Sequence, residues 1–173
     1  DFCLSRGLGD VYKRQAVEYA RSISGQVVTI NPEMINNAVK NSQFAEIIDA
    51  AELVIPDGIG VEIGLKILGH KVRRIAGIEF AHRMIEECAK DRLSVALIGA
   101  KPEIVQKAKE NLMKECSDLY ITYVQDGYFK DDEKVFNDLK IRQPRLVLCA
   151  LGSPKQEEFI CLLYTSDAAD DMQ

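Results

Sequence analysis

The stretch SVALIGAKPEIVQKAKENLMKE, residues 94–115, decides the fold class of this chain. It predicts a short apolar strand, Ser94–Ile98, then a turn that contains Gly99 and Pro102, then an amphipathic helix, Glu103–Glu115. A strand that is apolar on both faces and leads into a helix is typical of the βα units of a parallel sheet. Pro102 fits the first turn of the helix, because the backbone N–H that proline lacks would have no intrahelical partner there.

The same alternation extends in both directions from this stretch. Further strands are predicted at Gln26–Ile30, Glu52–Ile55, Tyr120–Val124 and Arg145–Leu151. Helices are predicted at Pro32–Asn41, Gly58–Leu68, Ile78–Lys90 and Asp131–Lys140, with a last one beginning near Pro154. This order predicts an α/β protein with a Rossmann-like three-layer fold and a mainly parallel sheet, in one domain. The apolar residues expected in its core are Val27, Ile30, Val54, Ala96, Ile98, Val124, Val147 and Leu148.

Composition excludes several classes of protein. The chain has 173 residues and a net charge of −5, which argues against a nucleic-acid-binding protein with its usual basic face. No apolar run approaches the roughly 20 residues that span a bilayer, so any membrane contact must come from a local patch. The five cysteines form no C-x-x-C pair and are expected to be free thiols in a reducing compartment. With two histidines far from any cysteine cluster, a zinc site is not expected.

The two ends of the chain differ from its body. Residues 1–15, DFCLSRGLGDVYKRQ, and residues 162–173, LLYTSDAADDMQ, resemble adapter-derived sequence at the ends of open reading frames. We therefore expect a non-native leader at 1–15, a core at 16–161 that is truncated at its C-terminus, and a non-native tail at 162–173.

Polar residues and glycines follow the predicted strands. In a parallel sheet these positions meet at one edge, where helix N-termini present unpaired N–H groups to anions. Each residue also has a simpler interpretation: Asn31 and Asp57 can cap the helices that follow them, and Ser153 with Gln156 has the spacing of a capping box. The candidate residues at this edge are Thr29, Asn31, Asp57, Gly99, Asp126, Tyr128, Gln156 and Glu157.

Two familiar nucleotide motifs are not matched. The turn Gly58-Ile59-Gly60 begins like a dinucleotide fingerprint, but that fingerprint needs a glycine where Ile63 stands. The G-x-x-x-x-G-K-[ST] phosphate loop does not occur either. A Rossmann dehydrogenase and a P-loop nucleotidase are therefore disfavoured.

Five motifs, in this order, resemble those of the WecG/TagA/CpsF glycosyltransferases, and most closely those of the TagA type. The resemblance covers residues 16–160 and implies an inverting transferase of wall teichoic acid synthesis. Such an enzyme moves N-acetylmannosamine from its UDP donor to N-acetylglucosamine on diphospho-undecaprenol. The motifs are Thr29-x-Asn31, Pro56-Asp57-Gly58-x-Gly60, Arg74-x-x-Gly77, Asp126-Gly127-Tyr128-Phe129 and Leu151-Gly152-Ser153-Pro154-Lys155-Gln156-Glu157.

The resemblance assigns roles to the candidate residues. Asp57 is expected to be the catalytic base, which takes the proton from the attacking hydroxyl. Thr29 and Asn31 are expected to contact the sugar or position the acceptor, and Arg74 or the turn at Gly99 to balance the charge of the departing diphosphate. Expected nucleotide contacts are Asp126, Tyr128, Gln156 and Glu157. The resemblance also implies an enzyme that needs no metal and no cofactor. No D-x-D motif follows a predicted strand, and Asp131-Asp132 is better explained as a solvated helix cap.

The chain also departs from the family pattern. Glu79 stands where relatives commonly have Asp, and the arginine-bearing C-terminal segment that closes the site and touches the membrane is not recognised here. We therefore expect a chain that folds and binds UDP but turns over poorly. The intact protein is expected in the cytoplasm, peripherally at the inner face of the cell membrane, with a polyprenyl-diphosphate acceptor and no nucleic-acid partner. A homo-oligomer, a uronic-acid or glucose donor, and a non-catalytic nucleotide-binding module remain open alternatives.

Overall fold

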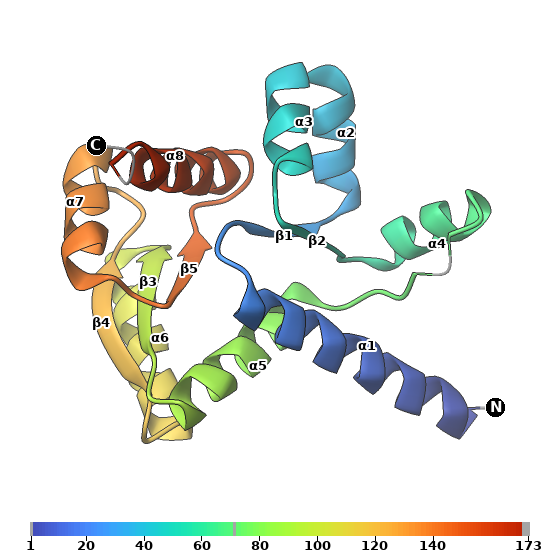
Figure 1. Ribbon diagram of the computed structural model, residues 1–173, viewed down its shortest axis with the longest axis horizontal. Coiled ribbons are helices and arrows are strands. Elements are labelled where there is room, and N and C mark those ends of the chain that lie inside the picture. Colours follow the sequence, from blue (N-terminus) through green and yellow to red (C-terminus); the bar gives the residue numbers. More distant parts are fainter. Residues whose placement is uncertain (1, 71, 171–173) are drawn as a thin grey trace. The chain divides into compact units, whose positions relative to one another are not determined.

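The computed structural model describes the backbone of residues 2–70 and 72–170, and the side chains of residues 11–70 and 72–164. The chain divides into two compact units, residues 1–81 and 82–173, and helix α5 (Gly77–Lys90) begins in the first and continues in the second. Each unit is a parallel α/β structure (Figure 1). This α/β architecture with parallel strands confirms the predicted fold class.

The first unit contains a two-stranded parallel sheet. Strand β1 (Val27–Ile30) pairs with β2 (Leu53–Pro56), so that Thr29 lies opposite Ile55 and Ile30 opposite Pro56. Helices α2 (Pro32–Lys40) and α3 (Ser42–Asp49) follow β1 and precede β2 in the sequence. The two helices lie side by side (Figure 1). They enclose a core with β1 that consists of Val28, Met34, Phe44 and Ile48.

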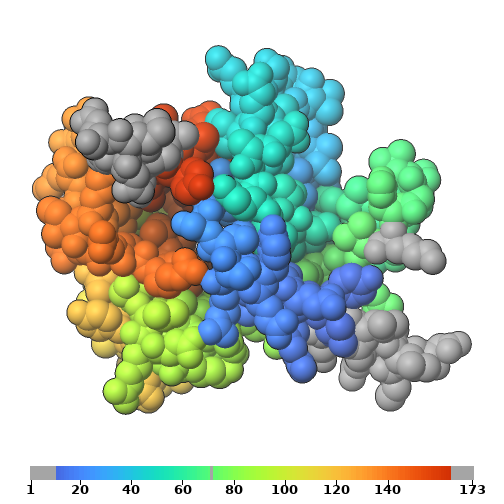
Figure 2. All heavy atoms as spheres, in the orientation of Figure 1, coloured from blue at the N-terminus to red at the C-terminus, as the bar shows by residue number. Residues whose placement is uncertain are grey.

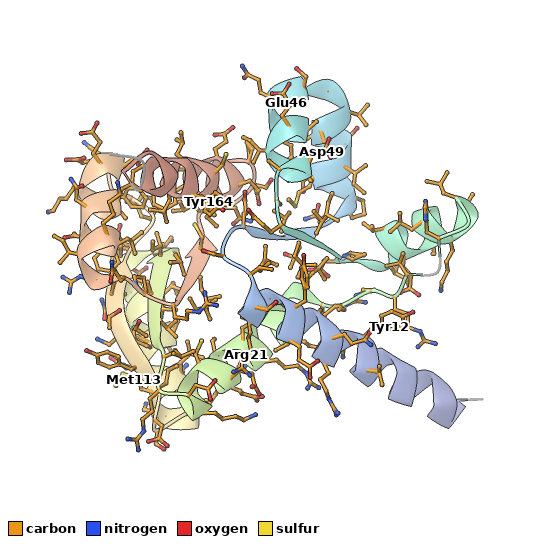
Figure 3. The ribbon with its side chains drawn as sticks, viewed as in Figure 1. Tyr12, Arg21, Glu46, Asp49, Met113 and Tyr164 are labelled. Carbon is orange, nitrogen blue, oxygen red and sulfur yellow. The ribbon has the colours of Figure 1, made fainter. Side chains whose placement is uncertain are left out.

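Two further helices belong to the first unit. Helix α1 (Phe2–Ser22) runs through the boundary predicted at residue 15, and it buries Val17 and Ala20 while Tyr12 is exposed (Figure 3). Lys13 of α1 forms an ion pair with Glu79 at the start of α5. Helix α4 (Ile59–Ile67) follows β2 and has Val61 as its one residue buried in the structure.

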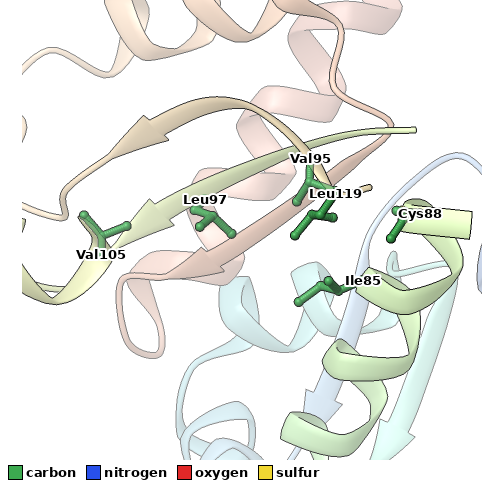
Figure 4. Packing of buried hydrophobic residues seen from close by; sticks show 7 residues of the cluster. Ile85, Cys88, Val95, Leu97, Val105 and Leu119 are labelled. Atoms are coloured by element: carbon green, nitrogen blue, oxygen red, sulfur yellow. The ribbon is translucent and has the colours of Figure 1, made fainter. Parts of the chain in front are cut away.

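The second unit contains a three-stranded parallel sheet in the order β4-β3-β5. Its strands are β3 (Ser94–Gly99), β4 (Tyr120–Gln125) and β5 (Leu146–Ala150), and its helices after α5 are α6 (Pro102–Glu115), α7 (Asp132–Arg142) and α8 (Lys155–Asp170). One hydrophobic cluster joins α5, β3 and α6, and another joins β3 to α7 and α8. Figure 4 shows the first cluster, whose buried members are Ile85, Cys88, Ala89, Val95, Leu97, Val105 and Leu119.

The predicted elements agree with these bounds to within one or two residues, but three expectations need correction. Helices α1 and α3 were not predicted, and the strands form two sheets where one was expected. An alternation of strands and helices indicates parallel pairing but does not say which strands are neighbours.

The predicted core is confirmed at its centre and wrong at its edge. Ala96 and Ile98 are buried in the central strand β3, whereas Val54 is 39% exposed. Val54 lies on β2, which is an edge of its two-stranded sheet, so one flank of the strand has no neighbour in that sheet. The remaining predicted members are half-buried: Val27, Ile30, Val124, Val147 and Leu148.

Candidate functional site

The loops that follow β1 and β2 are neighbours because the two strands are parallel and in register. The backbone N–H of Asp57 donates to the carbonyl of Ile30 at 2.8 Å, which ties the second loop to the first. Asn31 caps α2: its Oδ1 accepts from the backbone N–H of Met34 at 2.9 Å. The simpler interpretation of Asn31 is therefore confirmed, since an N-cap oxygen satisfies one of the helix's unpaired N–H groups.

Asp57 does not cap the helix that follows it, and that alternative is wrong. Gly58 is the N-cap of α4, with a φ of 93°, and no side chain caps this helix. The Asp57 carboxylate is instead directed to a different helix, where its Oδ2 accepts from the backbone N–H of Gly77 at 3.1 Å. Gly77 is the first residue of α5, and a helix N-terminus is a favourable place for an anion.

Thr29 also lies against Gly77, next to the Asp57 carboxylate. A Cβ atom at Gly77 would lie 3.1 Å from Asp57 Oδ2, 3.1 Å from Thr29 Oγ1 and 3.2 Å from Thr29 Cγ2. The hydroxyl of Thr29 and the carboxylate of Asp57 therefore both pack against the Cα of Gly77. The sequence prediction did not include Gly77 among the site residues, although the Arg74-x-x-Gly77 motif placed it directly before a helix.

Arg74 approaches the carboxylate from the loop before α5. Its Nε lies 4.0 Å from Asp57 Oδ1, the outer limit of an ion pair, and its side chain is 45% exposed. An exposed pair at this distance is weak, so the guanidinium remains able to bind another anion. We name Thr29, Asp57, Arg74 and Gly77 the Asp57 cluster.

Glu62 holds the backbone of Arg74 in position, a role that the sequence did not reveal. Its Oε2 accepts from the backbone N–H of Arg74 at 3.0 Å, and its Oε1 accepts from Lys66 Nζ at 2.6 Å. The hydrogen bond from Lys66, followed by that from Arg74, lowers the pKa of Glu62. The spacing of Glu62 and Lys66 predicts their helical pair, but not the contact with Arg74, which is remote in sequence.

In the second unit, the loops after all three strands are joined by backbone hydrogen bonds. The N–H of Ala100 donates to the carbonyl of Ala150 at 3.0 Å, and the N–H of Gly127 donates to the carbonyl of Ala100 at 2.8 Å. Gly99 has a φ of 119°, and a Cβ there would lie 2.3 Å from the carbonyl oxygen of Ala150. Ala100 adopts a φ of 59°. A non-glycine residue in this region is uncommon and is enriched at functional sites.

The predicted nucleotide contacts lie beside these joined loops. Asp126 Oδ1 accepts from the backbone N–H of Tyr128 at 2.8 Å, which forms a tight turn, and Tyr128 is 67% exposed. Glu157 is 3% exposed, and its Oε1 accepts from Gln156 Nε2 at 2.7 Å. The interior position of Glu157 suits a residue that orients Gln156 better than one that contacts a ligand directly.

The capping box expected for Ser153 and Gln156 is replaced by a related contact. Gln156 Oε1 accepts from the backbone N–H of Gly152 at 3.2 Å. The neighbouring Lys155 places its ammonium 5.0 Å from the centre of the Phe129 ring. Gln156 is therefore fixed at both ends of its amide, by Gly152 and by Glu157.

Burial raises the pKa of the Cys149 thiol, which lies close to this region. Cys149 is half-buried on β5, and desolvation raises its pKa to about 12. None of the cysteines whose side chains the structure describes is in a disulfide: these are Cys88, Cys116, Cys149 and Cys161. Cys3, the fifth cysteine, lies outside the side chains that the structure describes.

Two other features of the described residues concern metal ions and membranes. No cluster of three or more His, Cys, Asp or Glu side chains suited to a metal ion occurs in this part of the chain. Asp131 caps α7, accepting from the backbone N–H of Lys134 at 2.9 Å, as the sequence predicted. Of the helices in this same part, none combines the length and apolarity that crossing a membrane requires.

These features define a class of protein. Polar and glycine-rich loops beyond the carboxyl ends of parallel strands are typical of α/β proteins that bind their ligands at that edge. Comparison with known sequences then identifies the family. Residues 9–165 match the model of the glycosyl transferase WecG/TagA/CpsF family, and the chain belongs to this family.

Two curated relatives are N-acetylglucosaminyldiphosphoundecaprenol N-acetyl-beta-D-mannosaminyltransferases from Bacillus. The protein of Bacillus spizizenii is 30% identical over 135 residues, which are 78% of this chain and 52% of the relative. The protein of Bacillus subtilis strain 168 is 28% identical over 141 residues, which are 81% of this chain and 55% of the relative. The chain thus spans about half the length of these relatives.

Proposed function

We propose that this chain is part of an inverting glycosyltransferase that moves N-acetylmannosamine from UDP-N-acetylmannosamine to N-acetylglucosaminyl-diphospho-undecaprenol. This reaction would serve the synthesis of teichoic acid or a related cell-surface polysaccharide. Membership of the family and the names of the two Bacillus relatives support the proposal. The structural observation that carries it is the Asp57 cluster, in which a carboxylate is fixed by the N-terminus of α5 next to a hydroxyl and a guanidinium.

In the proposed mechanism, Asp57 is the general base of a single displacement. A hydroxyl of the acceptor sugar attacks the anomeric carbon of the donor and gives its proton to the Asp57 carboxylate. The new glycosidic bond forms as the bond between the anomeric carbon and the diphosphate oxygen breaks, and UDP departs with the bonding electrons. Gly77 holds one carboxylate oxygen and the other faces Arg74, so the orientation of the base is set before the substrates arrive.

Arg74 is proposed to balance charge on the departing diphosphate. The guanidinium is exposed, and its ion pair with Asp57 is weak enough to permit a second anionic partner. Thr29 and Asn31 are proposed to position the acceptor sugar, Thr29 through a hydroxyl that already packs beside Gly77. We propose a reaction that needs no metal ion, because a cation and helix N-termini can supply the charge.

The joined loops of the second unit are proposed to bind the nucleotide. The turn from Gly99 to Pro102 leads into α6, whose first N–H groups suit a phosphate. Further proposed contacts are Asp126, Tyr128 and Gln156, with Glu157 orienting Gln156. These roles are testable one at a time through the thermal stabilisation that UDP gives to each variant.

The lipid-linked acceptor leads us to propose that the intact enzyme works peripherally at the inner face of the cell membrane. We also propose that this chain turns over slowly. Transfer is therefore best measured in single-turnover experiments with enzyme in excess over labelled donor.

The deciding experiment compares three labelled donors with one acceptor, N-acetylglucosaminyl-diphospho-undecaprenol. UDP-N-acetylmannosamine is expected to give labelled lipid faster than UDP-N-acetylmannosaminuronic acid or UDP-glucose does. Faster transfer from one of the other two would reassign the donor. Stabilisation by UDP without transfer from any donor would indicate a non-catalytic nucleotide-binding module, and tighter binding of NAD than of UDP would indicate a dehydrogenase.

A further inference from the structure

Helix α4 presents an apolar stripe that is largely exposed. Ile59, Ile63 and Ile67 are spaced four residues apart and are 66%, 50% and 80% exposed, and Leu68, the C-cap residue, is 73% exposed. Residues four apart share one face of an α-helix. In Figure 2 the green segment that includes α4 can be seen at the surface of the face shown.

The composition of α4 differs from that of an ordinary surface helix. Its two charged residues, Glu62 and Lys66, pair with each other across one turn at 2.6 Å. Its remaining residues are Ile59, Gly60, Val61, Ile63, Gly64, Leu65 and Ile67, and all of them are apolar or glycine. A surface helix normally turns its apolar side inward, whereas α4 buries Val61 and exposes its isoleucines.

The sequence around the stripe is basic, although the protein as a whole is acidic. Residues 59–78 contain Lys66, Lys71, Arg73 and Arg74 but a single acidic residue, Glu62, while the whole chain has a net charge of −5. The acidic residues just outside this segment are engaged: Asp57 accepts from Gly77, and Glu79 pairs with Lys13. We name Ile59, Ile63, Ile67 and Leu68, together with Lys66, Arg73 and Arg74, the α4 patch.

We propose that the α4 patch binds the surface of an anionic membrane, with the isoleucine side chains inserted at the boundary of headgroups and acyl chains. Apolar residues on one face of a helix flanked by Lys and Arg are the features of helices that lie in this interface. Clustered basic residues add an attraction to anionic lipids that decays within a Debye length. The basic residues disfavour a two-fold symmetric contact between two copies of this chain through the α4 patch, because the same positive charges would face one another.

The position of the patch gives it a role that rests on the proposed function. Asp57 and Gly58 directly precede α4, and Arg74 belongs both to the basic segment and to the Asp57 cluster. A membrane bound at α4 would therefore lie next to the carboxylate that is proposed to activate the acceptor. A polyprenyl carrier could remain in the bilayer while its diphosphate and sugar reach Asp57.

The test measures sedimentation with vesicles in the absence of donor and acceptor, so that it does not depend on transfer. The chain is expected to bind vesicles of phosphatidylglycerol and phosphatidylcholine in equal parts, and to bind less in high salt or to phosphatidylcholine alone. Ile63→Glu with Ile67→Glu should weaken binding at least about tenfold, because full burial of one such side chain is worth one to two factors of ten. Val39→Glu is the matched control, because Val39 is 82% exposed on α2 of the same unit and should leave binding unchanged.

A second measurement removes any dependence on variants that fold poorly. The chain has no tryptophan, so Ile67→Trp introduces a unique fluorescent reporter. Its emission should shift to shorter wavelength with anionic vesicles and be quenched by brominated lipid, while the emission of Val39→Trp should not change. Equal responses at the two positions, or no binding of the unmodified chain, would overturn the proposal. So would an oligomer, seen by sedimentation velocity, that the double variant dissociates while vesicle binding is retained.

Failure of this proposal can be told apart from failure of the proposed function. If α4 binds the membrane but the enzyme has another acceptor, vesicle binding persists without transfer. If the transfer reaction is correct but α4 does not bind lipid, the Ile63→Glu, Ile67→Glu variant transfers to lipid-linked acceptor in vesicles as fast as the unmodified chain does.

Discussion

Replacement of Gly77 by alanine tests whether local packing positions the proposed base. The added Cβ would lie 3.1 Å from both Asp57 Oδ2 and Thr29 Oγ1, closer than most real Cβ contacts. Both neighbours must then move by a few tenths of an ångström. The hydrogen bond from Gly77 N to Asp57 Oδ2, at 3.1 Å, would be lengthened or bent as a result.

The change should affect catalysis far more than stability. A weakened hydrogen bond to a charged group costs up to about 1.5–3 kcal/mol, and less here because the Asp57 side chain is 34% exposed. Alanine in place of glycine gains back up to about 1 kcal/mol in a helix. The net change in unfolding free energy should be within about 1 kcal/mol, or a Tm change of about 2–4 °C. Displacement by 1 Å can cost about a hundredfold in rate, so a few tenths should cost about threefold to tenfold.

The assay is single-turnover transfer, with thermal unfolding measured on the same preparations. Gly64→Ala is the matched control, because nothing lies within 4 Å of a Cβ at that helical position and transfer should be unaffected. Transfer by Gly77→Ala at the unmodified rate would refute the reasoning that Gly77 sets the carboxylate position. A loss of rate explained entirely by unfolded protein would refute it as well.

Further predictions concern stability and thiol chemistry. Gly99→Ala should lower Tm by about 5–15 °C in thermal unfolding. The added Cβ would lie 2.3 Å from the carbonyl oxygen of Ala150, and the φ of residue 99 is 119°. An unchanged Tm would contradict the described turn. Asn31→Ala should cost about 1 kcal/mol in denaturant unfolding through loss of the α2 cap, whereas Asn31→Ser should cost less. Cys149 should be alkylated by iodoacetamide at pH 8 about a thousandfold more slowly than an ordinary thiol, because its pKa rises from 9.0 to about 12; mass spectrometry of its peptide measures this rate. The raised pKa means that the folded state favours the protonated thiol of Cys149. The stability linked to this protonation is therefore present below pH 9 and lost toward pH 12. Cys149→Ala should reduce the fall in unfolding free energy over that range.

The local elements were predictable because each has a strong signal in the sequence. Strand β3 is an uninterrupted apolar run, and Pro102 marks the start of the helix after it. Helix α1 was missed because residues 1–15 were interpreted as foreign to the protein, although the structure has one helix from Phe2 to Ser22. Helix α3 was missed because Asn41, which caps it, also ends α2, and the two helices leave no loop between them.

The candidate site was predictable in its members but not in its contacts. Parallel pairing of β1 and β2 brings the loops at Asn31 and Asp57 together, as the strand pattern indicates. The partner of Asp57 is 20 residues away at Gly77, and no local rule connects a carboxylate on one loop to the N-terminus of a remote helix. The burial of Glu157 was equally hidden, because an acidic residue in the first turn of a helix is usually solvated. Tertiary packing decides both of these features.

The rate of sugar transfer by Asp57→Asn tests the central claim most directly. Asparagine has the same shape and can still accept from Gly77 N through its amide oxygen, so the fold and the thermal stabilisation by UDP should persist. It cannot take a proton from the acceptor hydroxyl, and the single-turnover rate should fall by about a hundredfold to ten-thousandfold. Asp131→Asn makes the same chemical change at the cap of α7 and should leave the rate unchanged. Transfer by Asp57→Asn at a rate close to that of the unmodified chain would contradict the assignment of Asp57 as the base.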